Sequence, residues 1–143
     1  VLGERAFLPI MDGAVLALDW KQHRELWRHV DEQRPQEYRN SAAVAGDQVI
    51  VSSKNKQVDS ISVKTGERRW RYTLRRRADA SPVISAGDVW IAATDGRLIR
   101  LALADGRERW SYEIRGSFSA SPAIAGGEVV IADDNGIVRR FGP

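Results

Sequence analysis

The chain has 143 residues, of which 43% are hydrophobic and 29% are charged, and 22 Lys and Arg against 19 Asp and Glu give a formal charge of +3. This composition argues against disorder, and so small a positive excess does not indicate a nucleic-acid partner. No apolar run approaches the roughly 20 residues that a membrane-spanning helix needs, so we expect no membrane span. The sequence contains no cysteine, which excludes a disulfide framework, a thiol nucleophile and a thiolate metal ligand.

The chain starts at Val1 without an initiator Met and without a basic stretch followed by an apolar region. We therefore expect an excised or processed boundary at this point. Three short apolar runs follow, at residues 6–10, 14–18 and 26–30. Runs of this length bounded by turn residues are typical of strands.

An internal repeat occupies the rest of the chain. The stretch SAAVAGDQVIV at Ser41 returns as SPVISAGDVWI at Ser81 and as SPAIAGGEVVI at Ser121, so each copy is offset by forty residues. Three tryptophans, Trp27, Trp70 and Trp110, recur with a similar spacing of 43 and 40 residues. A period of this length indicates one supersecondary unit per repeat, stacked on its neighbours.

Each repeat contains four strand signals. In one unit the runs 81–85, 89–93, 98–103 and 109–114 are rich in Val, Ile, Trp and Tyr, and nothing in them has the length or the period of a helix. Turn pairs separate the runs, and such pairs tolerate the positive φ of a tight hairpin. They are Gly46-Asp47, Gly87-Asp88 and Gly127-Glu128 after the first strand, Asp12-Gly13, Asp95-Gly96 and Asn135-Gly136 after the second, and Thr65-Gly66 and Asp105-Gly106 after the third. The unit is therefore a four-stranded antiparallel meander.

These features predict an all-β fold, a partial β-propeller built from four-stranded antiparallel blades. Two blades are complete, at about 40–77 and 78–118, and two incomplete ones flank them, with the last three strands before residue 40 and the first three after residue 118. We expect residues 1–143 to form a single propeller segment. Since propellers need four to eight blades to close, the missing blades come either from the same longer chain or from a second copy in a homodimer.

The repeat resembles the PQQ-like, or quinoprotein-type, β-propeller family, whose blades carry the motif A-x-D-x-x-T-G-x-x-x-W. Residues 17–27 keep the Ala, Asp and Trp but have Gln22-His23 in place of Thr-Gly, whereas 60–70 keep Thr-Gly-x-x-x-Trp and 101–110 keep Gly-x-x-x-Trp. The resemblance implies that the tryptophans dock neighbouring blades beside the turn glycines. The implied docking residues are Trp27, Trp70, Trp110, Gly66 and Gly106.

The same resemblance raises the question of enzymatic chemistry. A PQQ-dependent dehydrogenase would imply a stacking Trp, calcium ligands, a catalytic Asp and often a vicinal disulfide, whereas this chain has no cysteine and only short connections. Residues 133–136 lack the alternating ligands of a calcium loop, and His23 and His29 lack a third ligand nearby. We therefore predict no catalytic residue, no metal site and no cofactor.

The remaining candidate site is a set of loops on one side of the propeller. Connections between blades and turns between second and third strands emerge on the same side, which groups several basic residues. The candidate binding face consists of Lys54, Lys56, Arg75, Arg76, Arg77, Arg34 and Tyr38. Such a face suits an acidic protein segment, an anionic surface or a polyanion, while a solvated rim balanced by Asp12, Asp79 and Asp95 is the alternative.

The predicted function is a non-catalytic scaffold for protein–protein interaction. The resemblance is to the outer-membrane assembly lipoproteins built from this repeat, which implies a bacterial envelope setting, in the periplasm or associated with the outer membrane. The alternative is a fragment of a PQQ-dependent quinoprotein dehydrogenase.

Overall fold

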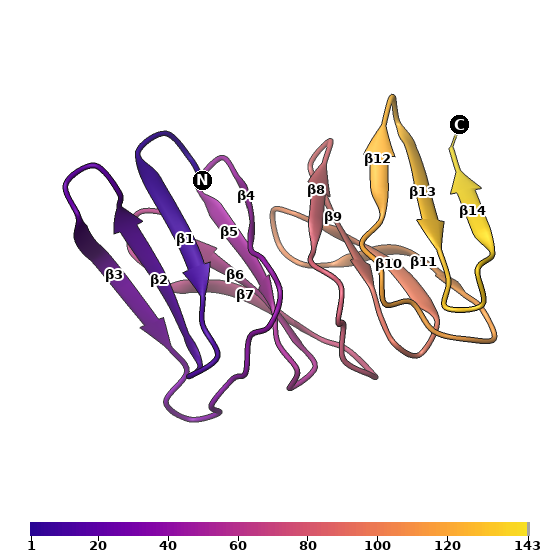
Figure 1. Cartoon of the computed structure of the whole chain (residues 1–143), viewed down its shortest axis with the longest axis horizontal. Coiled ribbons are helices and arrows are strands. Elements are labelled where there is room, and N and C mark those ends of the chain that lie inside the picture. The colour runs from indigo at the N-terminus through magenta and orange to yellow at the C-terminus, as the bar shows by residue number, and fades with distance from the viewer. Residues whose placement is uncertain (143) are drawn as a thin grey trace.

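The computed structural model describes residues 1–142, and in these residues every regular element is a strand. The strands form four antiparallel sheets of three, four, four and three strands, which follow one another in chain order from one end of the molecule to the other (Figure 1). The predicted all-β partial propeller and its strand count are therefore confirmed. We call the four sheets blades 1 to 4.

The bounds of the strands repeat from blade to blade. Blade 1 contains β1 (Arg5–Pro9), β2 (Ala14–Asp19) and β3 (Arg24–Val30), and blade 2 contains β4 (Ala43–Ala45), β5 (Gln48–Ser52), β6 (Gln57–Ser62) and β7 (Arg68–Thr73). Blade 3 contains β8 (Val83–Ser85), β9 (Asp88–Ala92), β10 (Arg97–Ala102) and β11 (Glu108–Glu113), and blade 4 contains β12 (Ala123–Ala125), β13 (Glu128–Ala132) and β14 (Val138–Phe141). Each blade is a meander in which sequential strands pair.

Two of the predicted first turns lie one residue earlier than the sequence suggested. The turns are Ala86-Gly87 and Gly126-Gly127, because Asp88 and Glu128 already belong to β9 and β13. The turn needs a positive φ at its first residue. Ala86 adopts a φ of 50°, although an alanine in a sequence does not indicate a positive φ.

The turn between β5 and β6 has no glycine. Lys56 takes the place that Gly96 holds in blade 3, with a φ of 67°. Its N–H donates to the carbonyl of Ser53 at 3.3 Å, as the N–H of Gly96 does to Ala93 at 3.1 Å. The turn is kept, and Lys56 bears the backbone strain.

Blade 1 contains one turn that the sequence analysis missed. Leu2 and Arg5 form an antiparallel bridge with two backbone hydrogen bonds, of 2.8 and 3.0 Å, across Gly3-Glu4. Gly3 has a φ of 58°, close to the 56° of Gly46 in the equivalent turn of blade 2. Val1 and Leu2 thus stand where the inner strands β4, β8 and β12 end in the other blades.

The core lies between the blades. One apolar cluster joins blades 1 and 2, a second joins blades 2 and 3, and a third joins blades 3 and 4. In β5, Val49 and Val51 face blade 1 while Ile50 faces blade 3, and all three are at most 1% exposed. Because both faces of an inner blade are covered, its strands are apolar on both sides.

Candidate functional site

Two tryptophans lie against the turn of the following blade. The ring of Trp27 packs on Gly66, where an added Cβ would come within 2.8 Å of the indole, and Trp70 packs on Gly106, where the distance would be 2.4 Å. The indole Nε1 of Trp27 donates to the carbonyl of Val63 at 2.8 Å. Trp70 makes the equivalent bond to Leu103 at 2.9 Å. Both contacts cross from one blade to the next.

Trp110 has different surroundings. Its ring stacks on Tyr112 at a centroid distance of 6.2 Å and meets Phe141 of blade 4 edge-on at 5.4 Å. It also lines a pocket of about 620 Å³ between blades 3 and 4, together with Trp90 and Arg100. Trp110 thus contacts the next blade, but through an aromatic side chain instead of a turn glycine.

The predicted candidate face is formed by the expected loops, which we call the loop face. It comprises the connections between blades, at 31–42, 74–82 and 114–122, and the turns between second and third strands. Each connection touches the turn of the next blade through a backbone bond: Lys54 N to Glu37 O at 2.8 Å, Thr94 N to Arg77 O at 2.9 Å, and Asp134 N to Ser117 O at 3.0 Å.

Three of the predicted basic residues on the loop face are paired with carboxylates. Lys54 lies 3.7 Å from Glu37, which Arg39 contacts as well. Arg75 lies 2.8 Å from Glu113 and 3.5 Å from Asp95. Arg77 lies 2.8 Å from Asp79. These exposed pairs reduce the positive field of the face.

The other three basic residues of the predicted face differ from these in having no carboxylate partner. Arg34, Lys56 and Arg76 are exposed, and within residues 1–142 their side chains form no ion pair. Arg115 in the third connection is exposed and unpaired as well, and the exposed carboxylates of Asp12, Glu32 and Asp134 form no ion pair within the described residues, so the loop face carries unpaired charge of both signs.

Tyr38 does not belong to the accessible surface, so its assignment to the candidate face is wrong. Its side chain is 1% exposed and packs with Phe7, Val15 and Val49 in the core between blades 1 and 2. Burial, with the negative charge of Asp59 nearby, raises the pKa of the Tyr38 hydroxyl above its ordinary value. The aromatic side chain anchors the longer loop to the core.

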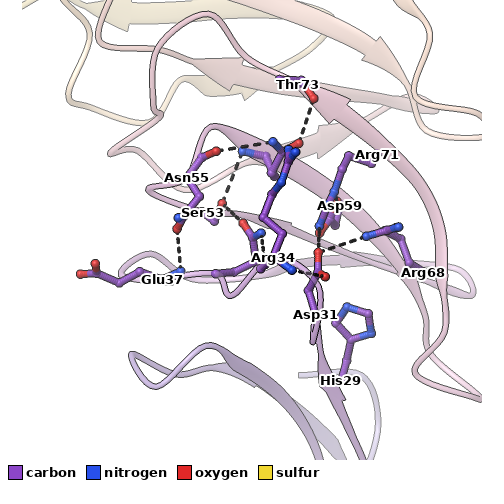
Figure 2. Close-up of polar contacts among 12 residues, drawn as sticks. His29, Asp31, Arg34, Glu37, Ser53, Asn55, Asp59, Arg68, Arg71 and Thr73 are labelled. Carbon is purple, nitrogen blue, oxygen red and sulfur yellow. Dashed lines mark hydrogen bonds and ion pairs between the residues drawn. The ribbon is translucent and has the colours of Figure 1, made fainter.

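A buried polar network also fixes this loop, as Figure 2 shows. Gln36, 4% exposed, accepts a hydrogen bond of 2.6 Å from Ser53 Oγ and donates one of 2.6 Å to the carbonyl of Arg34. Asn55 Oδ1 accepts from the N–H of Glu37 at 3.0 Å. The β5–β6 turn therefore holds the middle of the loop at two neighbouring positions.

An ion network lies beneath the loop where blades 1 and 2 meet (Figure 2). Arg71 donates to both oxygens of Asp59, at 2.6 and 2.7 Å, and to Asp31 at 2.7 Å. Burial opposes ionisation of Asp31, but hydrogen bonds from Arg71 and from the N–H of Arg34, with the charge of Arg68, outweigh it and lower the pKa of Asp31. This network cannot be predicted from the sequence, because Asp59 and Arg71 are an ordinary cross-strand pair until their burial is known.

The described residues do not fit the PQQ-type site that the resemblance to quinoproteins implies. Within residues 1–142, no three His, Asp or Glu side chains are grouped to hold a metal ion. Trp27 and Trp70 are engaged in contacts between blades. His29 Nδ1 lies 2.8 Å from the carbonyl of Gly66, and His23 is a turn residue with a φ of 53°.

No helix capable of crossing a membrane is found within residues 1–142. Together, the meander blades, the tryptophan contacts and the repeated turns define a β-propeller of the PQQ-like repeat class.

Comparison with known proteins identifies the family of the chain. The family model described as outer membrane protein assembly factor BamB matches residues 1–142, and the chain belongs to this family. Comparison with curated proteins finds no match.

Solved structures share the fold at low sequence identity. BamB from Moraxella catarrhalis is similar with a TM-score of 0.86 and 22% identity over 98% of this chain. The computationally designed Ika4 protein gives 0.86 and 16%, with 99% of this chain and 87% of its own covered. Quinohemoprotein alcohol dehydrogenase from Comamonas testosteroni gives 0.80 and 10%, with 93% of this chain and 28% of its own covered. The chain spans less than half of the Moraxella BamB, 43% of its length.

Proposed function

We propose that residues 1–143 form one non-catalytic propeller segment that serves as a scaffold for protein–protein interaction in the bacterial cell envelope, in the periplasm or beside the outer membrane. The observation that carries the proposal is the match of the outer-membrane assembly factor family to residues 1–142. The loop face supports it, because rigidly held loops present Arg34, Lys56 and Arg76 without carboxylate partners on a blade scaffold.

The kind of partner follows from the charge of this face. Exposed guanidinium groups bind carboxylates through paired hydrogen bonds, so an acidic protein segment is the expected ligand. The ion pairs of Arg75 and Arg77 limit the attraction, which favours a modest, salt-sensitive contact.

Site-specific photo-cross-linking tests the scaffold role. The full chain, exported to the periplasm of a Gram-negative bacterium, would carry a photoreactive amino acid at Arg76 or, as a control, at Ala104, an exposed residue in the β10–β11 turn. We expect a discrete protein adduct from position 76 only. Adducts of equal yield from both positions, or from neither, would contradict a binding role for the loop face.

The second candidate is a dehydrogenase propeller, favoured by the similarity to quinohemoprotein alcohol dehydrogenase. Addition of PQQ and Ca²⁺ to the purified chain, with a primary alcohol and an artificial electron acceptor, tests it. We expect no dye reduction above that of PQQ alone, and saturable alcohol-dependent reduction would support the dehydrogenase instead.

A further inference from the structure

A pocket of about 290 Å³ opens on the loop face at the end of blade 2, between the first and second connections. Its walls also include the end of β5 and the β5–β6 turn, and we call it the blade-2 pocket. Blade 2 has all four strands, and the pocket is formed by residues well inside the chain. The side chains that matter for its chemistry are those of Arg39, Asn40, Ser52, Lys54, Arg77 and Asp79.

Two polar side chains of this pocket stand at positions that are apolar in the other blades. Asn40 and Ser52 correspond to Ala80 and Ala92 of blade 3, each forty residues further along the chain. In blade 4 the same positions, 120 and 132, are again alanine. Because the blades with alanine contain the same strands, the fold does not require an amide or a hydroxyl group here. The polar pair is therefore a feature of blade 2 alone among these three blades.

The same two side chains, at the floor of the pocket, have unused hydrogen-bonding capacity. Ser52 is 1% exposed, and its Oγ accepts a hydrogen bond of 2.8 Å from Asn40 Nδ2 but donates none within residues 1–142. The same Nδ2 donates to the carbonyl of Ala80 at 3.0 Å, which fixes the orientation of the amide. Asn40 Oδ1 is then buried without a donor among the described residues. A ligand that supplies one acceptor and one donor would satisfy both groups.

Three basic side chains form the rim of the pocket and share two carboxylates. Arg39 Nε donates to Glu37 at 2.6 Å, and Arg77 Nε donates to Asp79 at 2.8 Å. The ammonium group of Lys54 lies 3.7 Å from Glu37, too far for a hydrogen bond. The rim therefore keeps one positive charge in excess. Within the part of the chain that the structure describes, N–H groups of Lys54 and the terminal nitrogens of Arg39 make no hydrogen bond.

These groups suit a carboxylate that lies beside an N–H donor. A carboxylate accepts hydrogen bonds from Ser52 Oγ and from the rim, where its single negative charge balances the excess. Asp79 in the wall repels an anion of higher charge. A cationic ligand would meet the positive rim, and an apolar ligand would leave the buried groups of Ser52 and Asn40 unpaired. An acidic residue in a protein segment provides both functions, since its backbone carries an N–H close to the side-chain carboxylate.

We propose that the blade-2 pocket binds an aspartate or glutamate side chain of an acidic protein segment. The carboxylate accepts hydrogen bonds from Ser52 Oγ, Lys54 and Arg39, and a backbone N–H of the segment donates to Asn40 Oδ1. This inference rests on the scaffold role proposed above and assigns one contact of that role to a single pocket.

A titration followed by nuclear magnetic resonance tests the binding of a carboxylate. The isotope-labelled protein would receive the peptide acetyl-Ala-Glu-Glu-Ala-amide or, as a control, acetyl-Ala-Gln-Gln-Ala-amide, which has amides in place of the carboxylates. We expect the first peptide to give saturable shifts of the Asn40 side-chain amide and of the Ser52 backbone amide. Its affinity should exceed that of the control peptide by at least about tenfold, because hydrogen bonds to a charged acceptor are the stronger ones.

Substitutions that copy blade 3 test the residues of the pocket. Ser52→Ala and Lys54→Thr each introduce the residue type that blade 3 has at the same position, so we expect both variants to fold. Ser52→Ala should weaken binding of the acidic peptide about tenfold, and Lys54→Thr should cause a smaller loss that shrinks with added salt. Lys64→Thr removes the same charge from the exposed β6–β7 turn at the opposite end of blade 2 and should leave binding unchanged. Near-ultraviolet circular dichroism checks that each variant is folded.

Equal affinities for the two peptides would overturn the proposal, as would full binding in a folded Ser52→Ala variant or the absence of saturable shifts at Asn40 and Ser52. These outcomes do not decide the scaffold role, which the photo-cross-link from position 76 tests. A discrete protein adduct from that position, combined with no peptide binding in the blade-2 pocket, would refute this inference and leave the scaffold role standing.

Discussion

At the scale of single residues, glycine plays two roles in turns of similar backbone conformation. Gly46 and Gly66 have φ values of 56° and 76°. Gly46 has open space around it, whereas Gly66 lies against the ring of Trp27. The first residue serves the turn alone, and the second also leaves room for the indole.

Gly66→Ala and Gly46→Ala separate these roles. We expect Gly66→Ala to lower the free energy of unfolding by about 2–4 kcal/mol, because backbone strain and overpacking against Trp27 add. Gly46→Ala should cost about 1 kcal/mol from strain alone, and Ala86 already holds the equivalent position. Urea unfolding measures both, and equal losses would argue against the Trp27 contact.

Lys56 offers a stabilising substitution. Since its φ is 67°, Lys56→Gly should raise the free energy of unfolding by about 0.5–1 kcal/mol, the relieved strain exceeding the added entropy of the unfolded chain. Lys56→Ala keeps the strain and is the matched control, expected to change little. A Lys56→Gly variant no more stable than Lys56→Ala in urea would show that the turn is unstrained.

At the scale of elements, the pair between β6 and β7 carries buried charge. Asp59 is 1% exposed and accepts two hydrogen bonds from Arg71. Asp59→Ala should lower the free energy of unfolding by about 3 kcal/mol, because Arg71 then keeps only Asp31 as a partner in a partly buried place. Asp79→Ala, which breaks the exposed pair with Arg77, should change it by less than about 1 kcal/mol in the same urea assay. Comparable losses would contradict the burial of the network.

The ionisation of Asp31 makes the stability contributed by the same network depend on pH. Its folded pKa lies below the unfolded value of about 4, so its contribution to stability is complete above that value and is lost as the pH falls through the folded pKa. The thermal midpoint of Asp31→Asn should therefore lie below that of the wild type at pH 6, with the difference shrinking below pH 4. A difference that is constant from pH 6 to the acid limb would exclude this linkage.

The strands and turns also show how much of the structure can be predicted from the sequence. Turn pairs with glycine, and apolar runs between them, predicted the strands and their order, since these signals are local. The positive φ of Lys56 and of Ala86 could not be predicted, because neither residue type favours this conformation. Tyr38 was placed on the surface because loops are usually exposed, and its burial depends on Phe7 and Val49, which only the packing of two blades brings to it.

At the scale of the whole molecule, stability resides in interfaces between blades, because each of the three apolar clusters joins two of them. Trp70 links the two complete blades through its ring on Gly106 and its bond to Leu103. The role of the tryptophans as docking residues therefore determines whether the molecule behaves as one stack. Trp70→Ala should cost about 3–5 kcal/mol in urea unfolding, and an unchanged midpoint would refute this role.

A double-mutant cycle on Trp70 and Gly106 tests the docking claim most directly. Gly106→Ala should cost about 2–4 kcal/mol in the wild-type chain but only about 1 kcal/mol in a Trp70→Leu background, where the ring that the new methyl group would meet is gone. Urea unfolding of the four chains gives the coupling energy. A coupling of at least about 1 kcal/mol is the predicted result, and strictly additive losses would contradict the docking of blades through tryptophan and glycine.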